Sequence, residues 1–202
     1  MARRVPVRVR RGAASLRGIA LIEVLITLVI LLFGLLGLAG VSSRASLAEM
    51  EAYQRIQALQ LLQDMADRLN ANRKVASCYS NGTIGVELSL SSTTPTTCTA
   101  GNVQQQTQAI ADLAAWKDLI SGQTETQSGT KLGAMIGAIG CVTLDDAANN
   151  VYLIAVSWQG LHKTVAPTLT DGSTAFPCGS GAYGDEKLHR VVSTKVRIGA
   201  LS

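Results

Sequence analysis

The sequence lacks the residue patterns that common catalytic and metal sites require. It has only two histidines, His162 and His189, and its four cysteines form no C-x-x-C pair, so a clustered metal site is not expected. The motifs G-x-S-x-G, H-E-x-x-H and G-x-x-x-x-G-K-[ST] are also absent. We therefore expect no enzyme activity, no cofactor and no bound metal.

Charge is nearly absent from a long stretch near the N-terminus. Residues 19–41 contain no Lys, Arg or Asp and a single acid, Glu23. About 20 apolar residues are enough to span a bilayer as a helix. A carboxylate inside such a helix costs roughly 3 kcal/mol, so it normally has a partner and a function. The stretch predicts a membrane helix that assembles with other chains rather than a plain anchor.

Acids are missing from the first 18 residues, which carry six arginines. By the positive-inside rule, this asymmetry places the N-terminus in the cytoplasm and the rest of the chain outside it. The basic segment ends at Gly18, directly before the apolar stretch. A secretory signal is cleaved after its apolar region. Here we expect processing before the apolar region, so that the helix stays on the mature chain.

The residues at this junction have a specific spacing. A basic leader, Gly18, four residues, Glu23 and an uninterrupted apolar run resemble the class III signal of type IV prepilins and pseudopilins. The resemblance implies that a prepilin peptidase cuts between Gly18 and Ile19, that Ile19 is N-methylated, and that Glu23 acts in subunit assembly. Ile19 departs from the commonest pattern, which has Phe, and Gly40 stands where many major pilins have Pro.

The two charges at this end suggest a physical role for Glu23. After cleavage, Ile19 would bear a free α-amino group, which is positive near neutral pH. In a bundle of low dielectric constant, this amine and the Glu23 carboxylate would attract strongly and relieve each other's desolvation. The resemblance implies that such pairing between subunits sets their axial register.

Cleavage would also change the net charge. The full chain has 18 basic and 14 acidic residues, and loss of the six leader arginines leaves 12 against 14, or −2. This balance argues against nucleic-acid binding, which requires a basic surface. The part outside the membrane helix is long enough for one compact domain.

Helical character continues beyond the apolar run. Residues 42–73 contain no Pro or Gly, their apolar residues recur every three or four positions, and Glu51–Arg55 and Asp64–Arg68 are favourable i,i+4 pairs. This predicts one helix over 19–73, the alternative being a membrane helix followed by a separate soluble one. Gly34, Gly37 and Gly40 could permit close helix contact or local melting, or have no special role.

The remainder predicts a small antiparallel sheet packed on the outer half of the long helix, an α+β pilin-like fold. The first expected elements are a polar loop at 77–108, with one strand at Val86–Leu90, and a helix at Ala109–Ile120, with Trp116 in the core. Strands are then expected at Gly140–Leu144, Val151–Trp158 and His189–Ile198, and Leu161–Ala166 could form a further hairpin strand. The organisation is therefore a leader (1–18), a membrane half-helix (19–41), a periplasmic half-helix (42–74) and a head (75–202).

Four cysteines lie in the head, which would be in the oxidising periplasm, so two disulfides are expected. Three connectivities are open. The local scheme, which we prefer, pairs Cys78 with Cys98 and Cys141 with Cys178. Each bridge would contribute on the order of 3 kcal/mol.

Short motifs in the head give a narrower resemblance. Those at 112–117, 140–142, 156–160, 177–179 and 190–192 are similar to the PilV family of type IV pilus minor pilins. The resemblance implies insertion in the inner membrane, then in the pilus, with the prepilin peptidase, the major pilin, other minor pilins and the inner-membrane assembly platform as partners. It also implies pilus functions such as cell adhesion and twitching motility.

Two other functions remain open. One is a pseudopilin of a type II secretion system. The other is a pilus-tip binding module, an adhesin or DNA receptor. A basic patch for the latter would come from residues that otherwise form a solvated strand face: Lys187, His189, Arg190, Lys195 and Arg197.

Overall fold

The computed structural model describes residues 17–122, 126–127, 130–131 and 135–199, with only the backbone at 17–20, 126–127 and 130–131. The chain divides into two compact units, one up to Ser46 and the other from Leu47 onward. Most of the expected leader, residues 1–16, lies outside the described residues.

The N-terminal helix α1 spans Arg17–Ala71 and contributes to both units. It is one helix of 55 residues, close to the expected 19–73, and the glycines within it do not interrupt it. It ends before Arg73, where a 3₁₀ turn (Arg73–Val75) and the short helix α2 (Ala76–Tyr79) follow. The backbone N–H of Asn72 still donates to the Arg68 carbonyl at 3.1 Å, so the last turn of α1 is closed.

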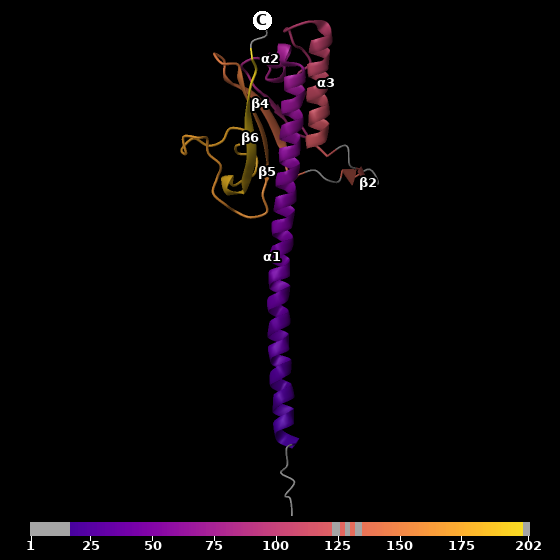
Figure 1. The fold of residues 1–202 in the computed structure, drawn as a ribbon, viewed down its shortest axis with the longest axis vertical. Helices are drawn as coiled ribbons and strands as arrows, with labels where there is room; N and C mark the ends of the chain where they lie inside the picture. Colours follow the sequence, from indigo (N-terminus) through magenta and orange to yellow (C-terminus); the bar gives the residue numbers. More distant parts are fainter. Residues whose placement is uncertain (1–16, 123–125, 128–129, 132–134, 200–202) are drawn as a thin grey trace, which may run out of the picture. The chain divides into compact units, whose positions relative to one another are not determined.

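The second unit is built on a four-stranded antiparallel sheet in the order β1-β4-β5-β6 (Figure 1). The strands are β1 (Val86–Leu88), β4 (Ile139–Asp146), β5 (Val151–Gln159) and β6 (His189–Arg197). β5 pairs with β4 and β6, and it is buried along most of its length because both faces of the sheet are covered there, as its apolar sequence predicts. A separate hairpin, β2 (Thr126–Gln127) with β3 (Thr130–Lys131), was not predicted.

The prediction of a hairpin strand at 161–166 is wrong. This segment forms no strand, because both edges of β5 are already occupied by β4 and β6. Its backbone donors bond elsewhere instead. Gly160 N–H donates to the Leu188 carbonyl and Thr164 N–H to the Lys187 carbonyl, each at 2.8 Å.

Helix α3 spans Val103–Ile120 and starts six residues before the predicted helix. Its first turn is polar, so the apolar period does not reveal it. The signal that would have revealed it is Asn102 followed three residues later by Gln105. The Asn102 side chain accepts from Gln105 N–H, and the Gln105 side chain accepts from Asn102 N–H, which is a capping box.

Residues 47–71 of α1 and helix α3 cover one face of the sheet. Trp116 is fully buried there, as predicted, and its indole N–H donates to the Leu61 carbonyl at 2.9 Å. Gly140 is required beneath it, because a Cβ at that position would collide with the rings and methyl groups of Trp116 and Ile120. The core on this face also contains Met65, Leu69, Tyr79, Leu88, Leu113, Val142, Ile154 and Val156.

The opposite face of the sheet is covered by the irregular segment between β5 and β6. Its smaller core comprises Ile139, Cys141, Ala155, Phe176, Cys178 and Tyr183. Alternate residues of each strand face the two cores, as the pleat requires. The observed architecture is thus α+β, a long N-terminal helix with an antiparallel sheet, as the sequence predicts.

Candidate assembly interface

The part of α1 in the first unit is an apolar surface without a covering. Every side chain described from Leu21 to Ser46 is exposed. Leu21, Phe33 and Leu38 are each exposed by 71% or more. An apolar surface of this size is stable only against lipid or other proteins. Within the described residues, α1 is also the one helix long and apolar enough to cross a membrane.

Glu23 is the single acid in this apolar stretch. Among the described residues, its carboxylate has no hydrogen bond and no ion pair, and the next charged residue along the helix is Arg44. Thr27, one turn away, donates its hydroxyl to the Val24 carbonyl at 2.9 Å and so does not serve Glu23. Gly18 and Ile19 lie in the first turn of α1, where only the backbone is described.

Two of the three glycines share a face of α1 with Glu23. At ~100° per residue, Thr27, Gly34 and Gly37 fall within about 40° of Glu23 around the helix axis, whereas Gly40 lies about 100° away. A Cβ at any of these glycines would meet nothing within 4 Å in this chain. Small residues let a second helix approach closely in a membrane. The face that carries the acid therefore also includes Gly34 and Gly37, although Ile30 and Val41 lie on it as well.

A second α1 carboxylate, Glu51, fixes the helix to the head within the second unit. It accepts from the backbone N–H of Leu161 at 3.0 Å and of His162 at 3.3 Å, and lies 3.5 Å from the Arg190 guanidinium. The expected pair with Arg55 is not among the ion pairs of the described residues; the expected Asp64–Arg68 pair forms, at 2.7 Å. Glu51 thus takes up the donors that would otherwise start a strand after Gly160.

A buried polar cluster joins α1, α2 and α3. The Asp112 carboxylate accepts from the Tyr79 hydroxyl at 2.5 Å, from Gln108 at 2.8 Å and from Arg68 at 3.1 Å. Burial, and then the bond to Asp112, raise the pKa of Tyr79 well above its ordinary value. This cluster holds the end of α1 against α3, since each buried polar group has a partner.

Both disulfides join the pairs that the local scheme preferred. Cys78–Cys98 closes the loop that contains β1, with Cα atoms 5.4 Å apart. Cys141–Cys178 ties β4 to the segment between β5 and β6, with Cα atoms 5.9 Å apart. Residues that belong to the PilV-like motifs meet around this second bridge: Ser157 Oγ lies 3.8 Å from Cys178 Sγ, and Ser157 faces Val191 in the ladder.

Three of the five residues proposed for a basic patch are buried or lie beside an acidic side chain. His189, expected on a solvated strand face, is fully buried, because Tyr183 packs against its ring and the Glu186 carboxylate lies 2.9 Å from Nδ1. Arg190 is beside Glu51, and Lys195 pairs with Asp145 at 2.7 Å. In the part of the chain that the structure describes, no three side chains are grouped as a metal site.

A comparison with known protein families found a match in the middle of the chain. Residues 41–116 match the family model described as Tt1218-like, Type IV pilin Tt1218. The match supports the type IV pilin family. It covers the second-unit part of α1, α2, β1 and most of α3, and does not include Gly18 or Glu23. It is therefore independent of the prepilin-like signal. Searches of curated proteins and of solved structures gave no significant match.

Proposed function

We propose that this chain is a minor pilin of a type IV pilus. A prepilin peptidase removes residues 1–18, Ile19 becomes N-methylated, and the exposed apolar helix holds the subunit in the inner membrane, with its head in the periplasm, until the assembly platform inserts it beside the major pilin. The observation that supports this most directly is that Glu23 lies in the exposed apolar part of α1 and has no partner among the described residues.

The chemistry of assembly follows from this arrangement. While residues 1–18 are attached, the Ile19 nitrogen is a neutral peptide group and cannot neutralise Glu23. Cleavage creates a cation one helical turn away, on the same chain or a neighbour. A paired carboxylate is then far less costly in an apolar bundle than an isolated one. Assembly therefore requires cleavage first, since only mature helices supply the matching positive charge.

The head supports the pilus over the secretion system through the motifs that converge on Cys178. The Gly-Cys-Val, Val-Ser-Trp-Gln-Gly and Pro-Cys-Gly segments lie on β4, on β5 and at the disulfide that joins the covering segment to the sheet. Three of the five PilV-like motifs therefore meet at one structural feature, whereas the motif at 112–117 lies on α3, on the other face of the sheet.

A fractionation experiment tests the proposal. Fibres sheared from cells that express the native chain should contain a form that starts at N-methylated Ile19, and deletion of the gene should reduce or alter piliation. Retention in the membrane with normal pili and failed export of secreted proteins would instead identify a pseudopilin. Normal piliation with loss of adhesion or DNA uptake would identify a tip-binding module.

A further inference from the structure

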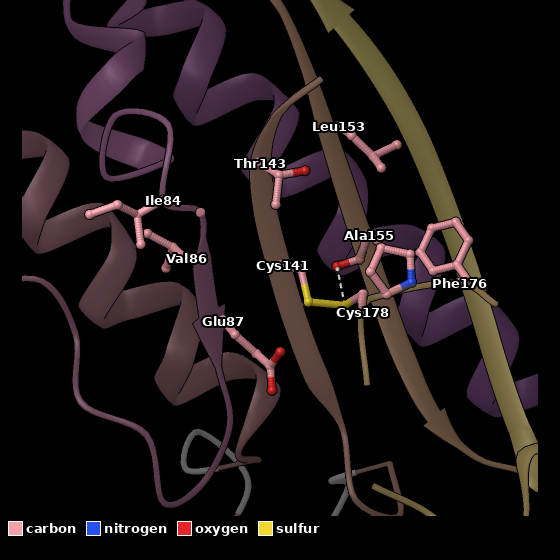
Figure 2. A pocket seen from close by; sticks show the side chains of 11 residues that line it. Ile84, Val86, Glu87, Cys141, Thr143, Leu153, Ala155, Phe176 and Cys178 are labelled. Carbon is pink, nitrogen blue, oxygen red and sulfur yellow. Dashed lines mark hydrogen bonds between the residues drawn. A yellow bond between two sulfur atoms is a disulfide. The ribbon is translucent and has the colours of Figure 1, made fainter. Parts of the chain in front are cut away.

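A narrow groove lies on the sheet face that α1 and α3 leave uncovered (Figure 2). One wall is the segment Ile84–Glu87, which includes the first two residues of the edge strand β1, and the other is Phe176–Cys178. The floor is formed by β4 and β5. The volume is about 160 Å³, comparable to one long side chain.

The groove is formed in advance of any binding. The Cys141–Cys178 disulfide joins its floor to one wall, and Phe176 N–H donates to the Pro167 carbonyl at 3.1 Å. The other wall turns at Gly85, whose φ of +89° favours glycine, and whose N–H donates to the Ser80 carbonyl at 2.9 Å. Because both walls are fixed, a ligand would lose little affinity to rearrangement.

The lining is mostly apolar, and its polar side chains are Thr143 and Glu87. Leu153, Ala155 and Phe176 supply carbon surface, and Ile84 at the mouth is 82% exposed. Glu87 is the only ionisable residue of the lining, and Figure 2 shows it beside the Cys141–Cys178 bridge. Its carboxylate is exposed, and within the described residues no ion pair or hydrogen bond satisfies it.

We infer that this groove receives a lysine or arginine side chain from a neighbouring protein subunit. These two side chains combine a long aliphatic stem with a cationic end. The stem would lie on Ile84, Leu153 and Phe176, and the cation would reach Glu87. A neighbouring backbone can approach, because β1 is an outer strand of the sheet. The contact uses the head alone, so it does not depend on the helix interactions proposed for Glu23.

The test uses the full chain in detergent, with ¹³C-labelled isoleucine and alanine methyl groups, and two model peptides. One is acetyl-glycyl-lysyl-glycine amide, and the other has norleucine, which keeps the stem and removes the charge. The lysyl peptide should shift the Ile84 and Ala155 methyl signals saturably. Its Kd should be about twofold to fivefold lower than that of the norleucine peptide, as expected for a partly exposed ion pair.

Two variants test whether the tighter binding of the lysyl peptide depends on the Glu87 charge. Glu87→Gln should make the two peptides bind equally, whereas the matched control Asp118→Asn, an exposed carboxylate on α3, should preserve the difference. Both positions are exposed, so the methyl spectrum outside the groove should stay native. The inference is overturned if the lysyl peptide leaves both methyl signals unmoved, or if its advantage persists in Glu87→Gln.

Discussion

At the scale of single residues, we predict that Gly18 is sensitive to the size of its side chain. It directly precedes the bond that we propose is cut, and the resemblance implies a peptidase that requires a small residue there. Gly18→Ala should be processed in part, whereas Gly18→Phe should leave the leader attached. Intact-mass measurement of the membrane fraction distinguishes the two forms. Normal maturation of the Phe variant, or a mature start other than Ile19, would refute the site.

A second residue-scale prediction concerns alkaline pH. Burial raises the pKa of Tyr183 to about 12, while its hydroxyl lies 2.9 Å from Ser157 Oγ. Since this pKa is higher when folded, its stabilisation is complete below pH ~10 and is lost as the pH rises from ~10 to about 12. The loss could reach about 3 kcal/mol, the product of roughly two pKa units and ~1.4 kcal/mol per unit.

Urea unfolding of the head, followed by near-UV circular dichroism between pH 8 and 11.5, measures this effect. The native chain should lose stability above pH ~10. Tyr183→Phe should be less stable at pH 8 but lose less on going to high pH. An equally steep fall in the variant would show that Tyr183 does not contribute.

His189 shows what residue-level inspection of the sequence could not provide. A histidine at the start of an alternating strand gives no sign of burial. Its environment comes from Glu186 and from the ring of Tyr183, 5.2 Å away between centroids, which the fold places over that end of β6. Further along β6 the alternation of the sequence matches the burial, because Val192, Thr194 and Val196 are less exposed than the residues between them.

At the scale of elements, α1 presents Glu23, Gly34 and Gly37 on one face and Gly40 on another. A Cβ at any of these glycines would meet nothing within 4 Å in the chain itself. Gly37→Leu should therefore reduce recovery of the chain in sheared fibres by keeping neighbouring helices apart, while the matched control Gly40→Leu should do so much less. Both variants should be processed normally. Equal effects of the two would remove the argument for this face.

Elements with a clear hydrophobic period were predictable, and features that depend on specific polar hydrogen bonds were not. The central strand β5 and the long helix follow from apolar patterns that reflect burial directly. The start of α3 depends on a capping box. After Gly160, where both edges of β5 are already occupied, the backbone N–H of Leu161 bonds instead to Glu51, 110 residues away. A carboxylate that caps distant backbone donors leaves no periodic trace in the sequence.

At the scale of the whole molecule, the disulfides link segments that secondary structure holds only weakly. The segment between β5 and β6 covers one face of the sheet largely without regular structure, and Cys141–Cys178 closes a separation of 37 residues. The Cys141→Ser, Cys178→Ser double variant should lose roughly 3 kcal/mol of stability. Urea unfolding measures this loss, and mass mapping of the native chain should find no free thiol. An unchanged midpoint, or free thiols in the native protein, would contradict the pairing.

We propose that Glu23, an acid within the exposed apolar part of α1, is neutralised by an amine created on maturation. Glu23→Gln keeps the shape of the side chain and removes its charge. It should leave cleavage after Gly18 intact, yet lower the amount of the chain in sheared fibres by about tenfold or more, since loss of one partner of a buried pair costs about 3–5 kcal/mol. Glu49→Gln, an exposed acid farther along α1, serves as the matched control and should assemble normally. Quantitative mass spectrometry of the sheared fibres gives the result, and equal incorporation of Glu23→Gln and the native chain would contradict the account.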